Sequence, residues 1–415
     1  MSKTVLQTLK GFRDFLPKEK RKRDYVTKKV IEMFERFGFE PLETPTLEYA
    51  SLLLGKYGDE ADKLVYSFKD RGGREVALRY DQTVPTARIL AQYQQVLPKY
   101  FRRYEIQNVF RADKPQQGRF REFTQCDIDI FNSTSPIADA EILAATYFAF
   151  KNVGYPEIIL LINHRAILFE LLSPFVSDTL NVFSIIQTID KLEKIGGSGV
   201  SEELQKKGLS KENADRAVSN VENAGNANDN LKSIIAFAEK LGIPKTSLKF
   251  TPHLARGLDY YTGMIFEVVL PGYTGGSCGG GGRYDKLIGQ LGGMDVPAVG
   301  IAFGFDRMVE AAEYFKIIPE DILKQPVLIT IFEESLLHNS LELADNLRQK
   351  GVHIEVFPGM VKLDKQLKYA NKKGIQNVLI LGPEEVKNKT VKLKDMKTGE
   401  QTTLTMQSLI NQLKI

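Results

Sequence analysis

Polar and apolar side chains alternate along one segment in the first third of the chain, Arg121-Glu122-Phe123-Thr124-Gln125-Cys126-Asp127-Ile128-Asp129-Ile130-Phe131. A period of two predicts a β-strand, because successive side chains of a strand point to opposite faces of its sheet. Ile128 and Ile130 then share an apolar face that we expect in the core. Gln125, Asp127 and Asp129 share the other face, which indicates either a solvated sheet surface or a binding floor.

Neighbouring segments repeat this alternation at residues 74–80 and 100–111. Few helical segments separate these runs, so we expect a mostly antiparallel sheet. Residues 38–45 read as a short strand whose prolines confine it to an edge or an interface. Between the last two runs lies a polar loop, residues 112–120, whose proline and glycine predict a hairpin. Its basic residues suit phosphate, although a solvated surface hairpin is the alternative.

Helical patterns and a change of composition divide the rest of the chain. Residues 17–37 have the spacing of an amphipathic helix that ends at Gly38, and a second helix is expected from Ser135-Pro136 to Gly154. Residues 168–241 are rich in Lys, Glu, Asn and Ser, which indicates an inserted helical subdomain. From about residue 325, strands alternate with lysine-rich helices, a pattern typical of a small α/β domain with a parallel sheet.

Composition excludes several classes of protein. The chain has 415 residues, 43% hydrophobic and 26% charged, so it is neither disordered nor membrane-spanning. A net charge of +4 permits a polyanionic partner without requiring one. Cys126 and Cys278 are too few for a disulfide framework and lack zinc spacing, and the four histidines have no metal spacing either. No targeting signal precedes Lys10, and we expect a cytoplasmic protein with no metal site of its own.

Two further segments carry chemistry. One is Ala255-Arg256-Gly257-Leu258-Asp259-Tyr260-Tyr261-Thr262-Gly263, which places an arginine and two phenols beside glycine-rich backbone. The glycine run that follows, residues 275–282, is expected to be a loop that orders over a ligand. The other is Pro297 to Met308, a strand leading into a helix with Arg307 in its first turn. A cation at that position opposes the helix dipole, so an anion such as phosphate is expected nearby.

These segments resemble the motifs of a known enzyme class. The hairpin with Phe110-Arg111 and Arg121-Glu122-Phe123 resembles motif 2 of class II aminoacyl-tRNA synthetases, Gly300 to Arg307 resembles motif 3, and Pro45 falls at the motif 1 proline. More specifically, Arg256-Gly257-Leu258-Asp259-Tyr260-Tyr261 resembles the signature peptide of histidyl-tRNA synthetases. Gly280 to Asp285 resembles the second signature of that family, and Gly11 to Pro17 resembles its opening.

The resemblance implies an α+β fold with a six-stranded antiparallel catalytic sheet flanked by helices. It divides the chain into catalytic parts at residues 1–167 and 249–322, a helical insertion at 168–248, and an α/β anticodon-binding domain at 325–415. It also implies a homodimer that binds ATP, L-histidine and tRNA(His), with Mg²⁺ on the leaving pyrophosphate. The implied reaction forms histidyl adenylate and then esterifies the terminal adenosine of the tRNA.

The resemblance also assigns roles to individual residues. Arg111 and Arg256 would grip the α-phosphate, Arg307 the γ-phosphate, and Glu122 the adenine. The histidine contacts would be Asp81, Thr83 and Gln125 at the α-ammonium group, Asp129 and Tyr260 at the imidazole, and Tyr261 completing the pocket. On a strand, adjacent tyrosines would face opposite sides, which leaves open which phenol faces the ligand. Lys114 and Gln116 would read the extra 5′ nucleotide of the tRNA.

Two positions depart from the family pattern. Asp113 and Asp306 stand where a glutamate is common, and each shortens the reach of the carboxylate by one methylene. Three other readings compete: a synthetase-like regulatory subunit of histidine biosynthesis without aminoacylation, a tRNA-sensing fragment of a larger kinase, and a generic ATP-dependent ligase. The first usually lacks the anticodon domain, the second would need kinase motifs, and the third leaves the C-terminal domain unexplained.

Overall fold

The computed structural model describes residues 6–54, 64–114, 120–255, 260–292, 295–323 and 325–413. The chain forms two compact units, Met1–Ile318 and Pro319–Ile415, which are described separately. None of the described helices has the length and apolar content that a membrane crossing requires.

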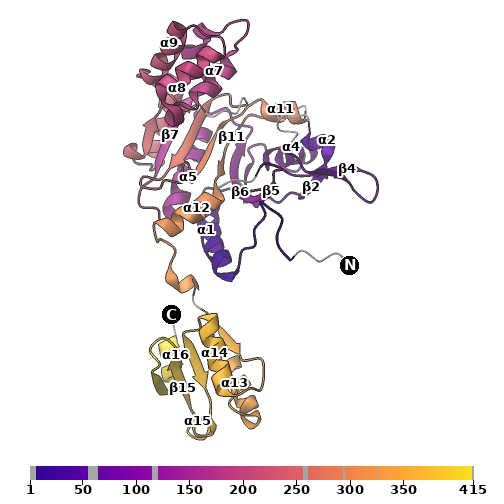
Figure 1. Cartoon of the computed structure of the whole chain (residues 1–415), viewed down its shortest axis with the longest axis vertical. Coiled ribbons are helices and arrows are strands. Elements are labelled where there is room, and N and C mark those ends of the chain that lie inside the picture. The colour runs from indigo at the N-terminus through magenta and orange to yellow at the C-terminus, as the bar shows by residue number, and fades with distance from the viewer. Residues whose placement is uncertain are drawn as a thin grey trace. The chain divides into compact units, whose positions relative to one another are not determined.

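A large sheet organises the first unit (Figure 1). In the described part of the chain it has eight strands, in the order β1 (Glu40–Pro41), β5 (Arg102–Phe110), β6 (Glu122–Phe131), β11 (Ala298–Phe303), β10 (Gly279–Arg283), β9 (Met264–Val269), β7 (Ile159–His164) and β8 (Leu248–Phe250). The six inner strands are antiparallel, whereas β1 and β8 pair in parallel with the outermost of them.

The expectation of six strands was therefore wrong for the whole sheet. The two additional strands, β1 and β8, are short and lie at the edges of the sheet. Pro41 of β1 has no backbone N–H group, and at an edge this removes no hydrogen bond between strands. The alternating runs at 74–80, 100–111 and 121–131 are confirmed as β4 (Glu75–Leu78), β5 and β6. β4 belongs to a second, antiparallel sheet of order β2 (Leu47–Tyr49), β4, β3 (Ser67–Lys69), which lies with α2 (Ala50–Leu53) and α4 (Thr83–Gln92).

Helices cover the apolar face of the main sheet. They are α1 (Pro17–Arg36), α5 (Pro136–Val153) and α12 (Phe305–Tyr314). The Ser135 hydroxyl accepts a hydrogen bond from the backbone N–H of Ile137 and so caps α5, which ends at Gly154 with a φ of 114°. Ile128 and Ile130 of β6 are buried in the same core as Phe34 of α1, so the alternation of β6 is confirmed on its apolar side.

The helical segment after β7 contains α6 (Arg165–Leu172), η1 (Ser173–Phe175), α7 (Val182–Ile189), α8 (Leu192–Lys206), α9 (Lys211–Glu222), α10 (Asp229–Lys240) and η2 (Lys245–Ser247). α7, α8 and α9 form a group above the sheet in Figure 1. The chain bends within α8 at Gly196, where φ is 71°. Leu231 and Ile234 of α10 instead pack in the main core beside α5. Buried residues of α6 to α9 belong to a second hydrophobic cluster, which also includes Leu90 of α4, Ile265 of β9 and Leu287 of α11.

The glycine run at residues 275–282 was predicted to be a loop, and this is wrong for its second half, because only residues 275–278 lie outside regular secondary structure. Residues 279–283 form β10, a fully buried strand between β9 and β11, followed by α11 (Leu287–Gly292). A Cβ atom on Gly281 would lie 2.0 Å from the carbonyl oxygen of Gly300. Glycines are therefore required because the neighbouring backbone approaches too closely for any side chain.

The second unit is a five-stranded mixed sheet in the order β13 (Ile354–Val356), β12 (Val327–Ile329), β14 (Asn377–Ile380), β15 (Thr390–Asp395), β16 (Gln401–Thr405). The helical elements of this unit are η3 (Glu320–Leu323), η4 (Glu334–Leu336), α13 (Leu337–Gln349), α14 (Leu363–Lys373), α15 (Pro383–Lys387) and α16 (Met406–Leu413). β13, β12 and β14 are parallel, as predicted, but β15 and β16 are antiparallel. The predicted parallel sheet is thus correct for three strands only.

Candidate active site

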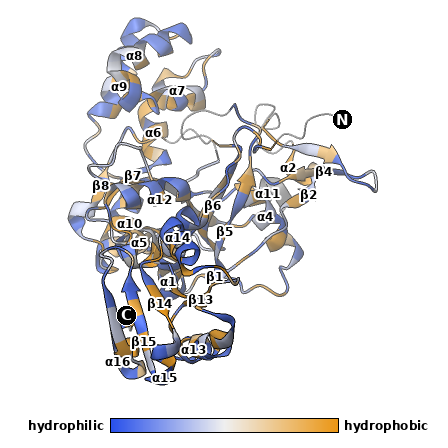
Figure 2. Ribbon diagram, turned by 60° about the horizontal axis from the view of Figure 1, so that its bottom comes forward, coloured by the Kyte–Doolittle hydropathy of each residue, from blue (hydrophilic) through white to orange (hydrophobic). Residues whose placement is uncertain are grey.

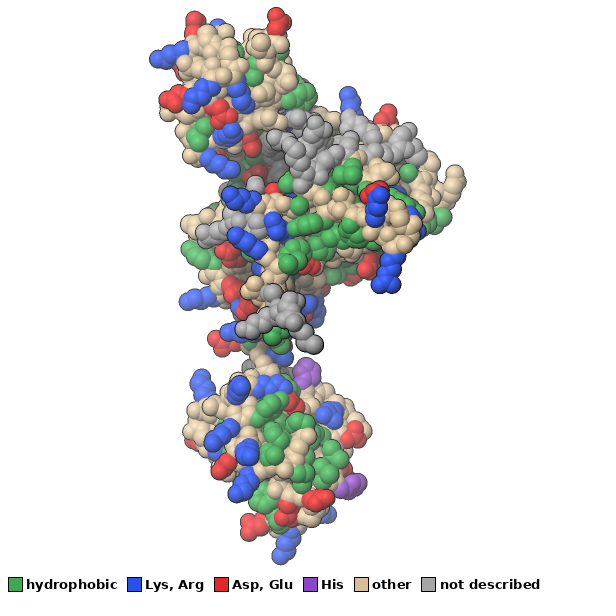
Figure 3. All heavy atoms as spheres, turned by 45° about the vertical axis from the view of Figure 1, so that its right-hand side comes forward, with side chains coloured by type: hydrophobic (Ala, Val, Ile, Leu, Met, Phe, Trp, Pro, Cys, Tyr) green, Lys and Arg blue, Asp and Glu red, His purple; other side chains and the backbone are tan. Residues whose placement is uncertain are grey.

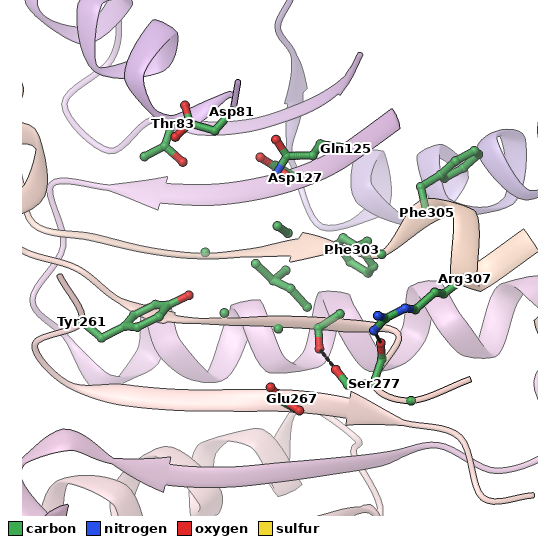
Figure 4. A pocket seen from close by; sticks show the side chains of 18 of the residues that line it. Asp81, Thr83, Gln125, Asp127, Tyr261, Glu267, Ser277, Phe303, Phe305 and Arg307 are labelled. Carbon is green, nitrogen blue, oxygen red and sulfur yellow. Dashed lines mark hydrogen bonds between the residues drawn. The ribbon is translucent and has the colours of Figure 1, made fainter. Parts of the chain in front are cut away.

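A cleft of about 1640 Å³ lies over the polar face of the main sheet. It is lined by most of the residues that the sequence singled out: Asp81, Thr83, Arg111, Gln125, Asp129, Tyr260, Tyr261 and Arg307. Several of them are labelled in Figure 4, which shows side chains from separate strands pointing toward one open space. Residues far apart in the sequence therefore converge, and the polar face of β6 is a cleft floor rather than a solvated sheet surface.

Charged side chains of β5 and β6 stand opposite one another in this floor. Antiparallel pairing places Arg103 opposite Asp129, and Glu105 opposite Asp127. Arg103 is 1% exposed; its guanidinium lies 2.8 Å from Asp129 and 3.2 Å from Glu105. Burial at this depth demands such pairing, because an isolated charge would lose its hydration without compensation.

Asp129 is held in one orientation from two sides. Arg103 approaches one carboxylate oxygen, and the hydroxyl of Tyr284 donates a hydrogen bond to the other. Burial and the negative charge of Asp129 raise the pKa of Tyr284, so its hydroxyl keeps the proton that it donates. Gly300 on β11 makes room for the carboxylate, since a Cβ atom there would lie 1.8 Å from Asp129 Oδ1. The result is a rigid acceptor in the wall of the cleft.

Asp81 and Thr83 lie where β4 gives way to α4. Asp81 Oδ1 accepts a hydrogen bond from the backbone N–H of Val84 at 3.1 Å, which satisfies a donor in the first turn of the helix. Thr83 is the first residue of α4. In Figure 4 both side chains lie across the cleft from Tyr261.

Tyr260 and Tyr261 both line the cleft. They precede β9, which begins at Met264, so the strand alternation that would have separated them does not apply. Their ring centroids are 4.6 Å apart, and the ring of Tyr284 lies 6.0 Å from that of Tyr260. The three phenols form one aromatic wall next to Asp129.

Two arginines supply positive charge at the cleft. Arg111 donates its Nε–H to the carbonyl oxygen of Tyr80 at 3.0 Å, and its guanidinium lies 5.1 Å from the ring centroid of Phe123. Arg307 donates from Nη1 to the carbonyl oxygen of Ser277 at 2.8 Å, as Figure 4 shows. These contacts leave further N–H groups of each guanidinium for a ligand.

Asp306 also lines the cleft, but arginines engage both of its carboxylate oxygens. Its carboxylate pairs with Arg13 at 2.8 Å and also accepts a hydrogen bond from Arg23. Arg13 in turn lies over the ring of Phe120 at 3.3 Å from its centroid. The shortened side chain at position 306 therefore ties the N-terminal segment to the start of α12.

Some predicted site residues are not brought into the cleft or fall outside the described structure. The carboxylate of Glu122 accepts a hydrogen bond from the Asn108 amide at 2.9 Å, and it is not among the residues that line the cleft. Lys114 is exposed and does not line it either. Arg256 and Gln116 lie outside the described residues.

The cleft also contains functional groups that the sequence did not single out. Asp127 lines it beside Gln125, and alternation along β6 had placed it on that face without assigning it a role. The alternation along residues 100–111 places Arg103 on a polar strand face, but its partner depends on the register of β5 and β6. Tyr284 lies in the second signature, yet nothing local pointed it at Asp129.

Among the described residues no group of three or more His, Cys, Asp or Glu side chains is arranged to hold a metal ion. His164 accepts a hydrogen bond from the backbone N–H of Ala166, so it caps α6. Cys126 and Cys278 are buried free thiols.

Comparisons with known proteins agree on one family. The family model described as histidyl-tRNA synthetase matches residues 11–308, and that of an anticodon binding domain matches residues 325–414. The histidine–tRNA ligase of Helicobacter acinonychis (strain Sheeba) is 39% identical over 420 residues, covering 95% of each chain. That of Christiangramia forsetii is 36% identical over 455 residues, covering 98% of each.

Solved structures share the fold. The crystal structure of histidyl-tRNA synthetase from Nostoc sp. PCC 7120 has a TM-score of 0.84 at 30% identity, covering 99% of both chains. A Bacillus halodurans protein described as an ATP phosphoribosyltransferase regulatory subunit/histidyl-tRNA synthetase has a TM-score of 0.76 at 23% identity, covering 92% of this chain and 99% of that one. At that identity the second likeness concerns the fold alone.

Proposed function

The chain belongs to the histidyl-tRNA synthetase family, and on that premise we propose that its cleft activates L-histidine with ATP and transfers it to tRNA(His). The observation that carries this proposal is the cleft itself, where an oriented carboxylate, three phenols and two arginines meet. The carboxylate and the phenols suit a polar amino acid, the arginines suit a polyphosphate, and the reaction requires both ligands side by side.

Arg111 is the group that we assign to the α-phosphate, together with Arg256. Attack by the histidine carboxylate builds negative charge on the α-phosphate oxygens, and a guanidinium can hold two of them at once. The backbone contact of Arg111 with Tyr80 and its position over Phe123 support a fixed orientation. No general base is required, because the carboxylate is already ionised at neutral pH.

The histidine pocket is assigned to the opposite part of the cleft. Asp129 would accept an imidazole N–H, with Tyr260 and Tyr261 closing the aromatic wall around the ring. Asp81, Thr83 and Gln125 would bind the α-ammonium group. An analogue that lacks ring N–H groups would leave the buried Asp129 unpaired, which is the physical basis for selectivity.

For ATP, we assign Arg307 to the γ-phosphate and Glu122 to the adenine. Mg²⁺ keeps several waters and is usually bound by substrate phosphates with one or two carboxylates. The described residues fit an ion of this kind, bound mainly through ATP, because Asp113 lines the cleft whereas both oxygens of Asp306 are engaged by arginines. When bound, Mg²⁺ would neutralise charge on the leaving pyrophosphate.

The tRNA would contact the second unit and the loop after β5. α14 is strongly hydrophilic in Figure 2, and its exposed lysines suit an RNA backbone: Lys365, Lys368, Lys372 and Lys373. Lys and Arg side chains are spread over the visible face of this unit in Figure 3. Lys114 and Gln116 are proposed to contact the extra 5′ nucleotide.

A homodimer is proposed from the exposed apolar side chains of the small sheet. Leu47, Tyr49 and Phe68 are 41%, 59% and 48% exposed, and such a group on one sheet indicates a protein interface. Light scattering of the purified protein tests this, and a monomeric mass at micromolar concentration would contradict it. Because the proposed reaction serves protein synthesis, we place the enzyme in the cytoplasm.

Histidine-dependent exchange of labelled pyrophosphate into ATP tests the reaction. We expect robust exchange in the wild type and a decrease of about 10² in Arg111→Ala or Arg256→Ala, the scale of losing one transition-state donor. Arg216→Ala on α9 is the matched control and should leave exchange unchanged. Histidine binding without exchange would support the regulatory-subunit alternative instead.

A further inference from the structure

One carboxylate in the cleft floor has no role in the assignments above. Asp127 lies in the middle of β6, is 4% exposed, and lines the cleft. Figure 4 shows it beside Gln125, within the pocket. Its cross-strand neighbours are Glu105 on β5 and Ala302 on β11. A carboxylate directly opposite another carboxylate destabilises a sheet, so its presence needs an explanation.

Charge around Asp127 is unbalanced. Ion pairs among the described residues connect two arginines with three carboxylates here: Arg79, Arg103, Glu105, Asp127 and Asp129. When all five are ionised, two positive charges face three negative charges, which leaves an excess of one negative charge. Buried charges are normally paired, so this excess points to a cation that enters with a ligand.

Hydrogen-bond donors are also missing around Asp127. Asp127 Oδ1 and Gln125 Oε1 are both buried, and neither has a donor among the described residues. Buried acceptors are almost always paired in native proteins. Two neighbouring acceptors that face a cleft therefore fit a ligand with several N–H groups. An ammonium group donates three hydrogen bonds and carries the missing charge.

A purely structural pairing of Asp127 with Arg103 does not account for this arrangement. Arg103 Nη2 lies 4.0 Å from Asp127 Oδ2, beyond hydrogen-bonding distance, whereas the same guanidinium lies 2.8 Å from Asp129 and 3.2 Å from Glu105. Arg103 is thus occupied by the two other carboxylates.

We propose that Asp127 is a further substrate-binding residue, whose carboxylate supplies the countercharge for the α-ammonium group of histidine, next to Gln125. This inference rests on the proposed histidine site and adds a residue to it. Burial raises the pKa of Asp127 well above its usual range; Arg103 opposes this effect, while Asp129, Glu105 and Asp81 reinforce it. An entering ammonium favours the ionised form, so histidine binding releases a proton from Asp127.

Asp127→Asn tests the proposal, because it removes the charge with little change of volume. The ligands are L-histidine and imidazole propionate, which has the same skeleton without the ammonium group. We expect the variant to bind histidine at least tenfold more weakly, the scale of a hydrogen bond to a charged group. Its affinity for imidazole propionate should change less than twofold. Asp190→Asn, at an exposed aspartate that also lines the cleft, should leave both affinities unchanged.

Calorimetry in two buffers of different ionisation heat measures the released proton. Wild type and Asp127→Asn contain the same histidine imidazole, so the difference between their proton counts reports Asp127. Stability gives a second readout. A carboxyl whose folded pKa is raised contributes stability that is lost as the pH rises toward that pKa, so the variant should become progressively more stable than the ligand-free wild type as the pH rises above 4.

Equal weakening of both ligands, or a loss of stability near neutral pH, would assign Asp127 a structural role and overturn the proposal. Unchanged histidine affinity would overturn it as well. Pyrophosphate exchange separates this outcome from a failure of the proposed function. A wild type that exchanges with histidine, combined with an unaffected variant, rejects only the role of Asp127, whereas a wild type without exchange rejects the reaction.

Discussion

Replacing Tyr284 by phenylalanine removes one oxygen atom from the wall of the cleft and keeps the ring. The hydroxyl is buried and donates a hydrogen bond to Asp129. Among the described residues, the other side chain that orients Asp129 is Arg103. Water cannot readily replace the lost donor at a site with 5% exposure. Tyr284→Phe therefore leaves a buried carboxylate oxygen without its hydrogen bond.

The magnitude follows from the charge of the acceptor. A hydrogen bond to a charged group contributes about 1.5–3 kcal/mol and a neutral one about 0.5–1.5 kcal/mol. Tyr155 provides the neutral comparison, because its buried hydroxyl donates to the carbonyl oxygen of Met308 at 2.5 Å. We expect Tyr284→Phe to lower the free energy of unfolding by about 1.5–3 kcal/mol and Tyr155→Phe by about 0.5–1.5 kcal/mol.

The two variants should differ more clearly in activity. Without Tyr284 the Asp129 carboxylate is free to rotate away from the imidazole. We expect kcat/KM for histidine to fall about tenfold, equivalent to about 1.4 kcal/mol, with KM for ATP unchanged. Tyr155 lies behind the sheet, so Tyr155→Phe should leave both parameters as in the wild type. Urea unfolding and pyrophosphate exchange, with histidine and ATP varied separately, measure these quantities.

Two results would contradict this reasoning. If Tyr284→Phe is no less stable than Tyr155→Phe, its hydroxyl does not serve a charged acceptor. If both variants lower kcat/KM for histidine equally, the effect arises from general loosening of the core and not from the orientation of Asp129.

Three further outcomes are expected. Gly300→Ala should lower kcat/KM for histidine by about 10². The added Cβ atom would lie 1.8 Å from Asp129 Oδ1, so the Asp129 carboxylate would have to move to an ordinary contact distance. A misplacement of about 1 Å in an active site has an effect of that size. Gly279→Ala, whose Cβ would meet its first neighbour at 3.3 Å, is the matched control, and equal losses in both would contradict the argument. Arg307→Ala should raise KM for ATP about tenfold or more in the exchange assay and leave KM for histidine unchanged; a change in the histidine value alone would exclude a phosphate contact. In the second unit, burial raises the pKa of Glu355, but hydrogen bonds from Lys373 and Tyr369 have the larger effect. The pKa of Glu355 is therefore lowered below 4.5. The resulting stabilisation is present above pH 4.5 and is lost as the pH falls through the lowered pKa. Glu355→Gln should thus cost about 0.5 kcal/mol at pH 7 and nothing in strong acid, and a deficit that persists in acid, measured by thermal unfolding, would refute this.

Local patterns were sufficient for several strands, among them β5 and β6, and for the polar face of β6 that forms the cleft floor. The alternation of residues 121–131 predicted β6 with its apolar and polar faces, because a strand near the core exposes one face to each environment. Ser135 and Gly154 marked the limits of α5 through capping chemistry that acts over a few residues. The resemblance to a family supplied the proposed roles of Asp81 and Thr83, which a strand or helix pattern cannot assign, whereas the position of Arg307 in the first turn of a helix already predicted a nearby phosphate.

Where prediction failed, close approach between distant segments was responsible. The glycine run was predicted to be a loop because glycine-rich backbone can move, yet β10 requires glycine where the backbone of β11 lies against it. Likewise, the separation expected for Tyr260 and Tyr261 assumed a strand that begins only at Met264.

The sequence by itself determined which side chains share a strand face, where helices begin and end, and which family the motifs resemble, since each depends on residues close together in the chain. Only the tertiary structure decided that Arg103 pairs with Asp129, that Tyr284 orients the same carboxylate, and that Asp127 Oδ1 has no hydrogen-bond donor among the described residues. These facts depend on the register between strands and on the distance between segments more than one hundred residues apart. No local pattern specifies such distances, because they are set by how the whole core packs.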